Sequence, residues 1–173
     1  MPLLSNYARK KKVDYFLPFV PKESRILEVG SGDGWLGRVL QSRGWQHYSG
    51  IDLGPPAAII GDIRNWRNLG IKPMSYDVII AFEVVEHVPC FRESYEILRP
   101  GGLLLLTSPR PGMNWLCGIL ELMGLTQART SPHNHLIRFE NVPFFEPVEI
   151  RRVGFVAQWG VFRKPLKSPE VKL

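Results

Sequence analysis

Ile26-Leu-Glu-Val-Gly-Ser-Gly-Asp-Gly-Trp-Leu-Gly37 is the stretch of this chain that decides its fold. The apolar run over residues 25–29 predicts a short strand, and the spacing over residues 35–43 predicts a helix. The three glycines between them predict a tight loop, because glycine adopts positive φ at little cost. N–H groups at the start of the helix face whatever lies on this loop. The stretch therefore predicts a site for a polar ligand, with a turn needed only for packing as the alternative.

The charges around the loop favour one kind of ligand. Residues 32–37 satisfy the three-glycine pattern of dinucleotide-binding proteins, which alone is a weak signal. Glu28 ends the strand and Asp33 lies in the turn, and two carboxylates would repel a bound pyrophosphate. S-adenosylmethionine carries a sulfonium and an ammonium against one carboxylate, so acidic surroundings suit it better than they suit NAD.

Composition limits the class of protein. The length of 173 residues indicates one domain over 1–173 with a proper core. No apolar run approaches the roughly 20 residues of a membrane span, so no transmembrane segment is expected. Cys90 and Cys117 have no metal or redox spacing, and the first residues do not resemble a secretory signal. These features predict a cytoplasmic protein.

The formal net charge is +6, and basic residues gather at 9–12, 151–152 and 163–172. Such runs are usually solvated surface. The alternative is an acidic partner such as a nucleic acid, a phosphorylated metabolite or an anionic membrane face. Charge alone does not choose among these partners.

Strands and helices alternate along the chain. An amphipathic helix is expected within residues 1–20, with apolar residues that can lie on the body at Val13, Phe16, Leu17 and Val20. Further strands are expected over 47–53, 57–60, 76–82 and 103–107, and further helices over 64–69 and 91–98. The alternation predicts an α/β, Rossmann-like, doubly wound and mostly parallel sheet with helices on both faces.

The last third of the chain departs from this alternation. Residues 108–140 are expected to form an inserted lid or substrate segment that contains an apolar helix over 115–125. One strand is expected around residues 154–156, and residues 163–173 are expected to be a loose basic tail.

Acidic residues follow two of the strands. Asp52 lies twenty residues after Gly32, the usual distance from a nucleotide loop to the acid that binds the ribose hydroxyls. A carboxylate accepts both hydroxyl protons, and Gly-Pro-Pro after Asp52 leaves no helix for it to cap. In an open α/β sheet the ligand lies at the carboxyl ends of the strands, so Phe82 and Glu83 are expected to border it.

Four motifs in order resemble the class I S-adenosylmethionine-dependent methyltransferases: Glu28-x-Gly30-x-Gly32-x-Gly34, Gly-Ile-Asp52, the segment from Asp77 to His87, and Leu-Arg-Pro-Gly-Gly102. The resemblance covers roughly residues 25–155. It implies the fold of that family and S-adenosylmethionine as the cofactor, which leaves as S-adenosylhomocysteine. It also implies transfer of a methyl group to an oxygen or nitrogen of an acceptor, most often a small molecule. The family sheet ends in an antiparallel hairpin, and too few residues remain here, so a shortened hairpin is expected.

The resemblance also implies site residues. It implies that Asp62 faces the adenine amino group and that the backbone N–H of Ile63 bonds to the adenine ring. The residues alone also allow Asp62 to cap the helix expected over 64–69. The expected cofactor-binding residues are Glu28, Gly30, Ser31, Gly32, Asp33, Gly34, Asp52, Leu53, Asp62, Ile63, Phe82 and Glu83.

The segment from Glu83 to Pro89 resembles ubiquinone-pathway O-methyltransferases and, more distantly, small-RNA 2'-O-methyltransferases. In those families it implies a divalent cation, for which the candidate ligands here are Glu83, Glu86, His87 and, as a fourth, His135. The alternative, that the segment only shapes the pocket and caps a helix, is preferred, so no metal is assigned firmly.

His87 and Glu86 are the expected catalytic residues. A hydroxyl or neutral amine acceptor must lose a proton, and histidine titrates near the working pH. Two other functions stay open: a non-catalytic S-adenosylmethionine-binding or partner subunit, and an NAD-dependent oxidoreductase. The oxidoreductase reading lacks a hydride-site pattern such as Tyr-x-x-x-Lys.

Overall fold

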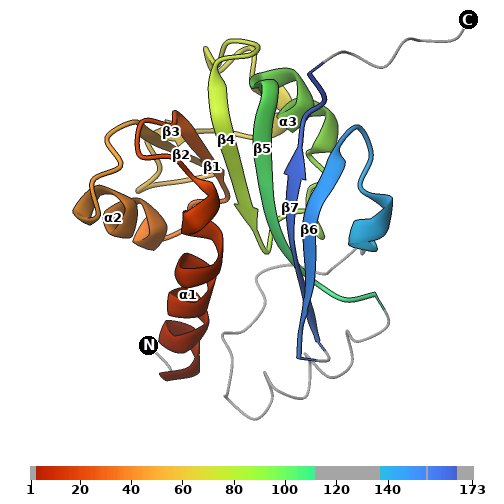
Figure 1. Cartoon of the computed structure of the whole chain (residues 1–173). Helices are drawn as coiled ribbons and strands as arrows, with labels where there is room; N and C mark the ends of the chain where they lie inside the picture. The colour runs from red at the N-terminus through yellow and green to blue at the C-terminus, as the bar shows by residue number, and fades with distance from the viewer. Residues whose placement is uncertain (1–2, 112–136, 155, 167–173) are drawn as a thin grey trace, which may run out of the picture.

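A seven-stranded sheet forms the centre of the protein in a computed structural model that describes residues 3–111, 137–154 and 156–166 (Figure 1). The strands are β1 (Ile26–Val29), β2 (Tyr48–Asp52), β3 (Ile59–Ile60), β4 (Tyr76–Phe82), β5 (Leu98–Pro109), β6 (Glu146–Val153) and β7 (Ala157–Arg163). Their order is β3-β2-β1-β4-β5-β7-β6. The first five are parallel, and β7 is antiparallel to both β5 and β6. The mostly parallel, doubly wound sheet expected from the sequence is confirmed.

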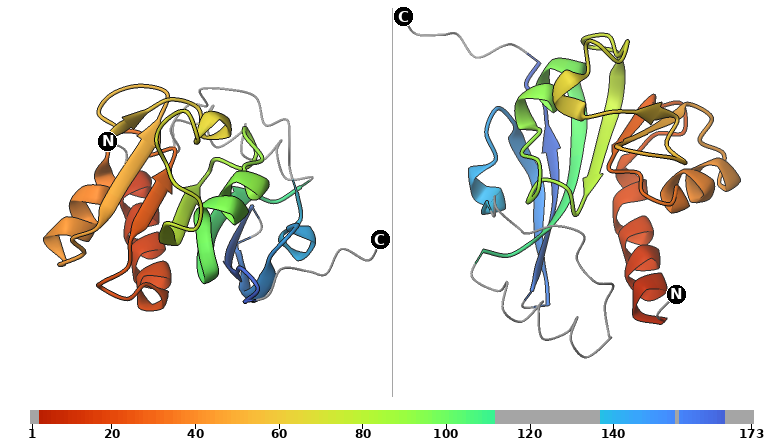
Figure 2. Two further views of the ribbon diagram at one scale, coloured as in Figure 1. Left: turned by 90° about the horizontal axis from the view of Figure 1, so that it is seen from above. Right: turned by 180° about the vertical axis from the view of Figure 1, so that it is seen from behind.

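Helices cover both faces of this sheet (Figure 2). The central strands are apolar on both sides because alternate residues point to opposite faces. One core, which contains Ile26 and Ile80, packs against α1 (Leu3–Phe16) and α2 (Trp35–Ser42). The other core, which contains Leu27 and Ile79, packs against α3 (Phe91–Ile97).

The N-terminal helix packs on the body as expected. After α1 the chain continues into a short 3-10 helix, η1 (Leu17–Phe19), that contains a proline. The predicted contact residues are all buried: Val13, Phe16, Leu17 and Val20. Within α1, Val13 and Phe16 therefore mark the side that faces the sheet, whereas Lys10, Lys11 and Asp14 are exposed.

The final hairpin is not shortened as the sequence suggested. β6 has eight residues and β7 has seven, and Gly154 lies in the turn between them rather than inside a strand. β6 is an edge strand in which every residue is exposed or half-exposed. It therefore lacks the alternation of apolar and polar residues by which a strand is recognised.

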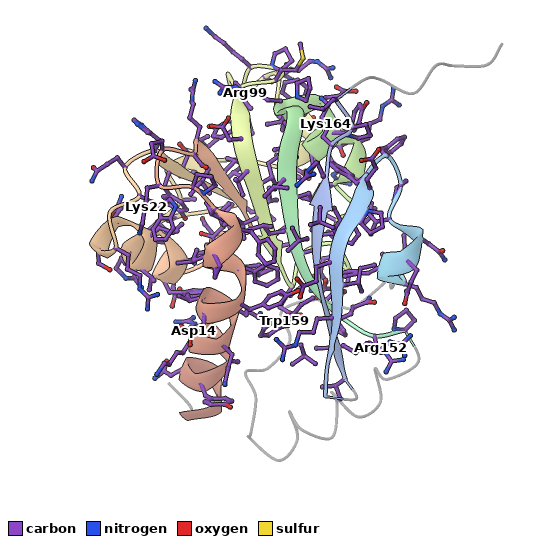
Figure 3. All side chains as sticks on the ribbon, viewed as in Figure 1. Asp14, Lys22, Arg99, Arg152, Trp159 and Lys164 are labelled. Carbon is purple, nitrogen blue, oxygen red and sulfur yellow. The ribbon has the colours of Figure 1, made fainter. Side chains whose placement is uncertain are left out.

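Other segments also differ from the expectation. The helix expected over 64–69 is only the single turn η2 (Ile63–Asn65). The loose tail does not begin at Arg163, which ends β7, because Lys164 is buried and donates from Nζ to the carbonyl oxygens of Tyr95 at 2.6 Å and Leu98 at 2.8 Å (Figure 3). The helix expected over 115–125, His135 and residues 167–173 lie outside the described residues. No helix within the described ranges is long and apolar enough to cross a membrane.

Candidate active site

A pocket of about 370 Å³ lies where β1, β2 and β4 end. Eight residues singled out in the sequence line it: Gly30, Asp52, Leu53, Asp62, Ile63, Phe82, Glu83 and His87. Six further lining residues were not singled out: Val29, Ile51, Gly61, Arg64, Val84 and Val88. The predicted residues Glu28, Ser31, Gly32, Asp33, Gly34 and Glu86 do not line the pocket and lie around it.

At Gly30, the loop after β1 lies in close contact with the segment after β4. Gly30 has φ +73°, and its N–H donates to the carbonyl of Ile51 at 2.9 Å. A Cβ at this position would lie 2.4 Å from Cγ2 of Val84, inside van der Waals contact. Only glycine therefore fits here, and the main chain of the loop stays bare toward the pocket.

Asp52 is held in place by the backbone on both sides. Its Oδ2 accepts the N–H of Gly32 at 2.7 Å, and its Oδ1 accepts the N–H of Leu53 at 2.7 Å. A carboxylate has about four acceptor sites, so two hydrogen bonds leave capacity for a ligand's hydroxyls. The residue that sequence spacing selected is thus oriented before any ligand binds.

Asp62 serves as a cap and also lines the pocket. Its side chain accepts the N–H of Arg64 at 2.9 Å at the start of η2 and forms an ion pair with the same guanidinium at 2.5 Å. The hydrogen bond from Arg64 is the main reason that the pKa of Asp62 lies below its ordinary value. Of the two roles that the sequence left open, capping is observed, and the contact with adenine stays a prediction.

Glu28 lies in β1, just before the glycine loop, and does not line the pocket. It is 3% exposed, and the hydroxyl of Tyr48 donates to its Oε2 at 2.5 Å. Burial raises the pKa of Glu28 to about 8, and the nearby charges of Asp33 and Asp52 act in the same direction. Glu28 is therefore largely protonated at neutral pH, and the negative charge around the loop comes from Asp33, Asp52 and Glu83.

Two cations from α1 reach carboxylates around the site. Nη2 of Arg9 lies 3.1 Å from Oδ2 of Asp33, and Nζ of Lys12 lies 2.9 Å from Oε1 of Glu83. The partners are 24 and 71 residues apart in the sequence, so no local pattern could have revealed them. Part of the basic run that was interpreted as solvated surface therefore pairs with acidic groups of the same chain.

Glu83 adopts an unusual backbone conformation directly after β4. Its φ is +56°, which non-glycine residues rarely adopt. Its Oε1 accepts from Lys12 and, at 2.8 Å, from the hydroxyl of Thr107, although 43% of the side chain is exposed. Desolvation alone would raise the pKa of Glu83, but the Lys12 ammonium and these hydrogen bonds outweigh it and hold the pKa below its ordinary value. Glu83 is therefore ionised.

Glu86 has the opposite protonation state. It is 1% exposed, and its Oε2 has no hydrogen-bond partner among the described residues. Burial, and then the charge of Glu83, raise the pKa of Glu86 to about 8. Two carboxyl groups three residues apart thus divide into one ionised and one protonated group, as expected when like charges share a site.

His87 completes this side of the pocket. The side chain is half-buried in the lining, and its backbone N–H donates to the carbonyl of Val84 at 2.8 Å. No three His, Cys, Asp or Glu side chains of the described ranges come together in a way that could hold a metal ion. Glu83 is paired with Lys12 and Glu86 is buried, while His135 lies outside these ranges.

A family model described as a methyltransferase domain matches residues 5–154. The chain belongs to the class I S-adenosylmethionine-dependent methyltransferases. The match spans the glycine loop, Asp52 and the segment from Glu83 to His87, and so includes every part of the pocket. The resemblance read from four motifs is confirmed.

Curated relatives include methyltransferases that are longer than this chain. A ubiquinone biosynthesis O-methyltransferase of Aeromonas salmonicida is 26% identical over an alignment of 156 residues, and the match covers 77% of this chain and 61% of that protein. The chain therefore spans about three fifths of the length of that relative.

Solved structures of methyltransferases share the fold. A putative sarcosine dimethylglycine methyltransferase from Galdieria sulphuraria has a TM-score of 0.67 and 12% identity, covering 94% of this chain and 87% of that chain. A phosphoethanolamine N-methyltransferase from Haemonchus contortus, in complex with S-adenosyl-L-methionine, has a TM-score of 0.61 and 14% identity, covering 90% of this chain and 52% of that chain. At these identities the likeness concerns the fold.

Proposed function

We propose that this protein transfers the methyl group of S-adenosylmethionine to an oxygen or nitrogen of a small-molecule acceptor. The observation that carries the proposal is the pocket at the ends of β1, β2 and β4, where bare main chain at Gly30 lies beside the carboxylates of Asp52 and Glu83. A flat, polar and cationic ligand fits this arrangement, since the loop offers backbone and the walls offer negative charge.

Each wall of the pocket contributes to holding the cofactor. Asp52 accepts from the ribose hydroxyls, and Asp62 with Ile63 borders the adenine. Gly30 lies against the amino-acid part of the cofactor, Gly32 and Gly34 shape the rest of that loop, and Glu83 offsets the positive charge of the cofactor. S-adenosylmethionine supplies the electrophilic methyl group, and the protein accelerates transfer mainly by holding donor and acceptor in line in a dry pocket.

His87 accepts the proton that the acceptor loses. It lines the pocket next to Glu83, and an imidazole nitrogen can accept a proton as a general base. Glu86 is the polar partner behind it, and as a protonated carboxyl it adds no second negative charge beside Glu83. The curated relative is named an O-methyltransferase, which supports an oxygen acceptor. A divalent metal is not assigned a role.

Calorimetry on this chain tests the cofactor half of the proposal. S-adenosylmethionine, S-adenosylhomocysteine and NADH would each be titrated, with and without magnesium, into the parent protein, Asp52→Ala and the control Asp14→Ala. Asp14 is exposed on α1 (Figure 3), so its loss should leave affinity unchanged. S-adenosylhomocysteine should bind the parent protein, and Asp52→Ala should weaken that binding at least about tenfold. Binding of neither sulfur compound would refute the proposal.

A screen for methyl transfer tests the catalytic half. Phenols, catechols, quinone precursors and amines would be offered with labelled S-adenosylmethionine. Methyl transfer to any of them establishes the enzyme and identifies the acceptor atom. Tight cofactor binding without transfer to any acceptor would instead support the alternative, a non-catalytic S-adenosylmethionine-binding or partner subunit.

A further inference from the structure

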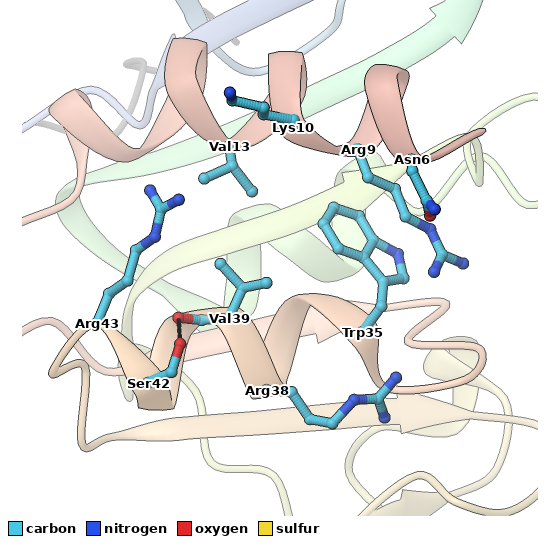
Figure 4. Close-up of a pocket in the computed structure, with 9 residues that line it drawn as sticks. All are labelled: Asn6, Arg9, Lys10, Val13, Trp35, Arg38, Val39, Ser42 and Arg43. Carbon is cyan, nitrogen blue, oxygen red and sulfur yellow. Dashed lines mark hydrogen bonds between the residues drawn. The ribbon is translucent and has the colours of Figure 1, made fainter. Parts of the chain in front are cut away.

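A groove lies between α1 and α2, which pack on the same face of the sheet (Figure 4). Its volume is about 470 Å³, within the range of pockets that bind small molecules. Val13 and Val39 point toward each other between the helices, and Trp35 reaches from α2 toward α1. The groove shares none of its described lining residues with the cofactor pocket.

The rim of this groove is strongly basic. Four of its nine described lining residues are cationic, and none is acidic: Arg9, Lys10, Arg38 and Arg43 are joined by Asn6, Val13, Trp35, Val39 and Ser42. Like charges gathered on one groove repel one another and create a positive potential there. An anion relieves that repulsion, whereas a neutral ligand does not.

The cations are positioned from two helices. Nη1 of Arg38 donates to the backbone carbonyl of Asp33 at 2.6 Å, and Arg9 pairs with the carboxylate of Asp33 and lies over the ring of Trp35 at 5.1 Å. Within the described ranges, the side chains of Lys10 and Arg43 have no carboxylate partner. Two cations are therefore fixed on the wall near the glycine loop, and two more are available to a ligand.

We propose that the groove between α1 and α2 is a second ligand site, which binds a small molecule that carries a phosphate group on an apolar or aromatic body. Lys10 and Arg43 bind the phosphate, because cations bind phosphate oxygens through charge-assisted hydrogen bonds. Val13, Trp35 and Val39 cover the apolar body. A nucleic acid is a poorer fit, since the cations gather around one groove between two helices rather than along a stripe of the surface.

Calorimetry with phenyl phosphate, inorganic phosphate and phenol tests this site on the full chain in a low-salt, phosphate-free buffer. Phenyl phosphate should bind at least threefold more tightly than inorganic phosphate, because its ring covers the apolar floor, and phenol should not bind measurably. Lys10→Gln combined with Arg43→Gln should weaken phenyl phosphate binding about tenfold. The contacts of Arg9 and Arg38 with Asp33 stay intact in this variant.

The matched control is Lys72→Gln combined with Arg163→Gln, which removes the same charge from two exposed positions outside the groove. It should bind phenyl phosphate within twofold of the parent protein. Excess S-adenosylhomocysteine and the variant Asp52→Ala should both leave phenyl phosphate binding in place. These measurements therefore distinguish a protein that does not bind the cofactor from one that does not bind phenyl phosphate in the groove.

Four outcomes would overturn the proposal. The first is that phenyl phosphate does not bind the parent protein, and the second is that the groove variant and its control weaken phenyl phosphate binding equally. The third is that S-adenosylhomocysteine displaces phenyl phosphate. The fourth is that a short DNA duplex or an anionic vesicle binds and that both double variants weaken this binding equally. The last would show a general polyanion surface. Thermal unfolding of both variants checks that each is folded before it is titrated.

Discussion

The two halves of the candidate site hold their carboxylates in different ways. After β1 and β2, backbone N–H groups within a few residues of the pocket hold both oxygens of Asp52. After β4, Glu83 depends on Lys12 from a distant helix and on Thr107 from the next strand. Its neighbour Glu86 is buried and leaves Oε2 without a partner among the described residues.

Under the proposed function, the half after β1 and β2 binds the cofactor and is called the cofactor half. The half after β4, where Glu83 meets the cofactor's charge and His87 meets the acceptor, is called the acceptor half. Local backbone geometry fixes the cofactor half in advance, so it loses little freedom when the cofactor binds. The acceptor half keeps one ionised and one protonated carboxyl side by side, which is the kind of perturbed pair found at functional sites. Changes in the first half should therefore alter affinity and stability, and changes in the second should alter turnover.

Of the tests of this separation, the His87→Ala variant should show the largest effect. Turnover should fall about 100- to 1000-fold, because a general base is lost, while the dissociation constant of S-adenosylhomocysteine changes less than about twofold. Steady-state kinetics and calorimetry on one preparation measure both. His47→Ala is the control, since His47 is exposed before β2 and should leave both values unchanged. Unchanged turnover in His87→Ala would remove this residue from catalysis.

Gly30→Ala tests how rigidly the cofactor half is built. The new Cβ would collide with Val84 in a backbone conformation that L-residues rarely adopt, so unfolding free energy should fall by about 2–4 kcal/mol in urea denaturation. In a Val84→Ala background the loss should be smaller by about 1 kcal/mol, since the collision partner is gone.

Gly44→Ala separates strain from collision. Gly44 also has positive φ, but nothing lies within 4 Å of its added Cβ, so only backbone strain of about 1 kcal/mol is expected. Equal losses at Gly30 and Gly44, or no rescue by Val84→Ala, would show that the loop is not wedged against the chain after β4.

Glu28→Gln sharpens the comparison through pH. The pKa of Glu28 is raised from 4.5 to about 8, so the folded state holds this proton more tightly than the unfolded state does. The stability that this group contributes is therefore fully present below about pH 4.5 and is lost as the pH rises through about 8. Gln keeps an acceptor for Tyr48 and cannot ionise. Between pH 6 and 9 the variant should therefore lose less stability than the parent protein, by on the order of 1–3 kcal/mol in urea denaturation.

The control for Glu28 is the exposed Glu23. Glu23→Gln should follow the pH dependence of the parent protein. Turnover of Glu28→Gln should stay near that of the parent protein at neutral pH, where Glu28 is already largely protonated. A variant with the same pH slope as the parent protein would contradict the buried, protonated state of this residue.

Lys12→Met should have the smallest effect and concerns the acceptor half. Without its ammonium, Glu83 attracts a cation more strongly, and S-adenosylmethionine carries one more positive charge than S-adenosylhomocysteine. The ratio of their affinities should therefore shift about two- to fivefold toward S-adenosylmethionine at low salt. Lys11→Met on the same helix should leave the ratio unchanged, because Lys11 has no carboxylate partner within the described ranges. A shift in the opposite direction would show that Glu83 does not face the cofactor's charge.

Much of the fold and of the cofactor half could be predicted from the sequence. Strand and helix periodicity gave β1, α2 and β4 to within a residue or two, and the spacing from Gly32 identified Asp52. These features are local, because a glycine loop and the acid after the next strand are set by short stretches of chain. The hydrogen bond between Gly32 and Asp52 is what that spacing produces.

The acceptor half could not be predicted as fully, because it depends on contacts between distant segments. Lys12 pairs with Glu83 across 71 residues, and the basic run of α1 gave no sign of that partner. In the cofactor half, the loss of charge at Glu28 follows from its burial, which the motif did not reveal, and its hydrogen-bond partner Tyr48 lies 20 residues away. β6 was missed because an exposed edge strand carries no apolar alternation.

The order of the strands has a consequence for synthesis. β7 lies between β5 and β6, and β6 has no other neighbour in the sheet. A ribosome that builds this chain therefore releases β6 before the strand that must join it to the sheet has been made. Until residues 157–163 emerge, the edge of β5 and the whole of β6 present unpaired backbone groups to other chains. The nascent protein is thus most exposed to misassembly shortly before its last described strand is complete.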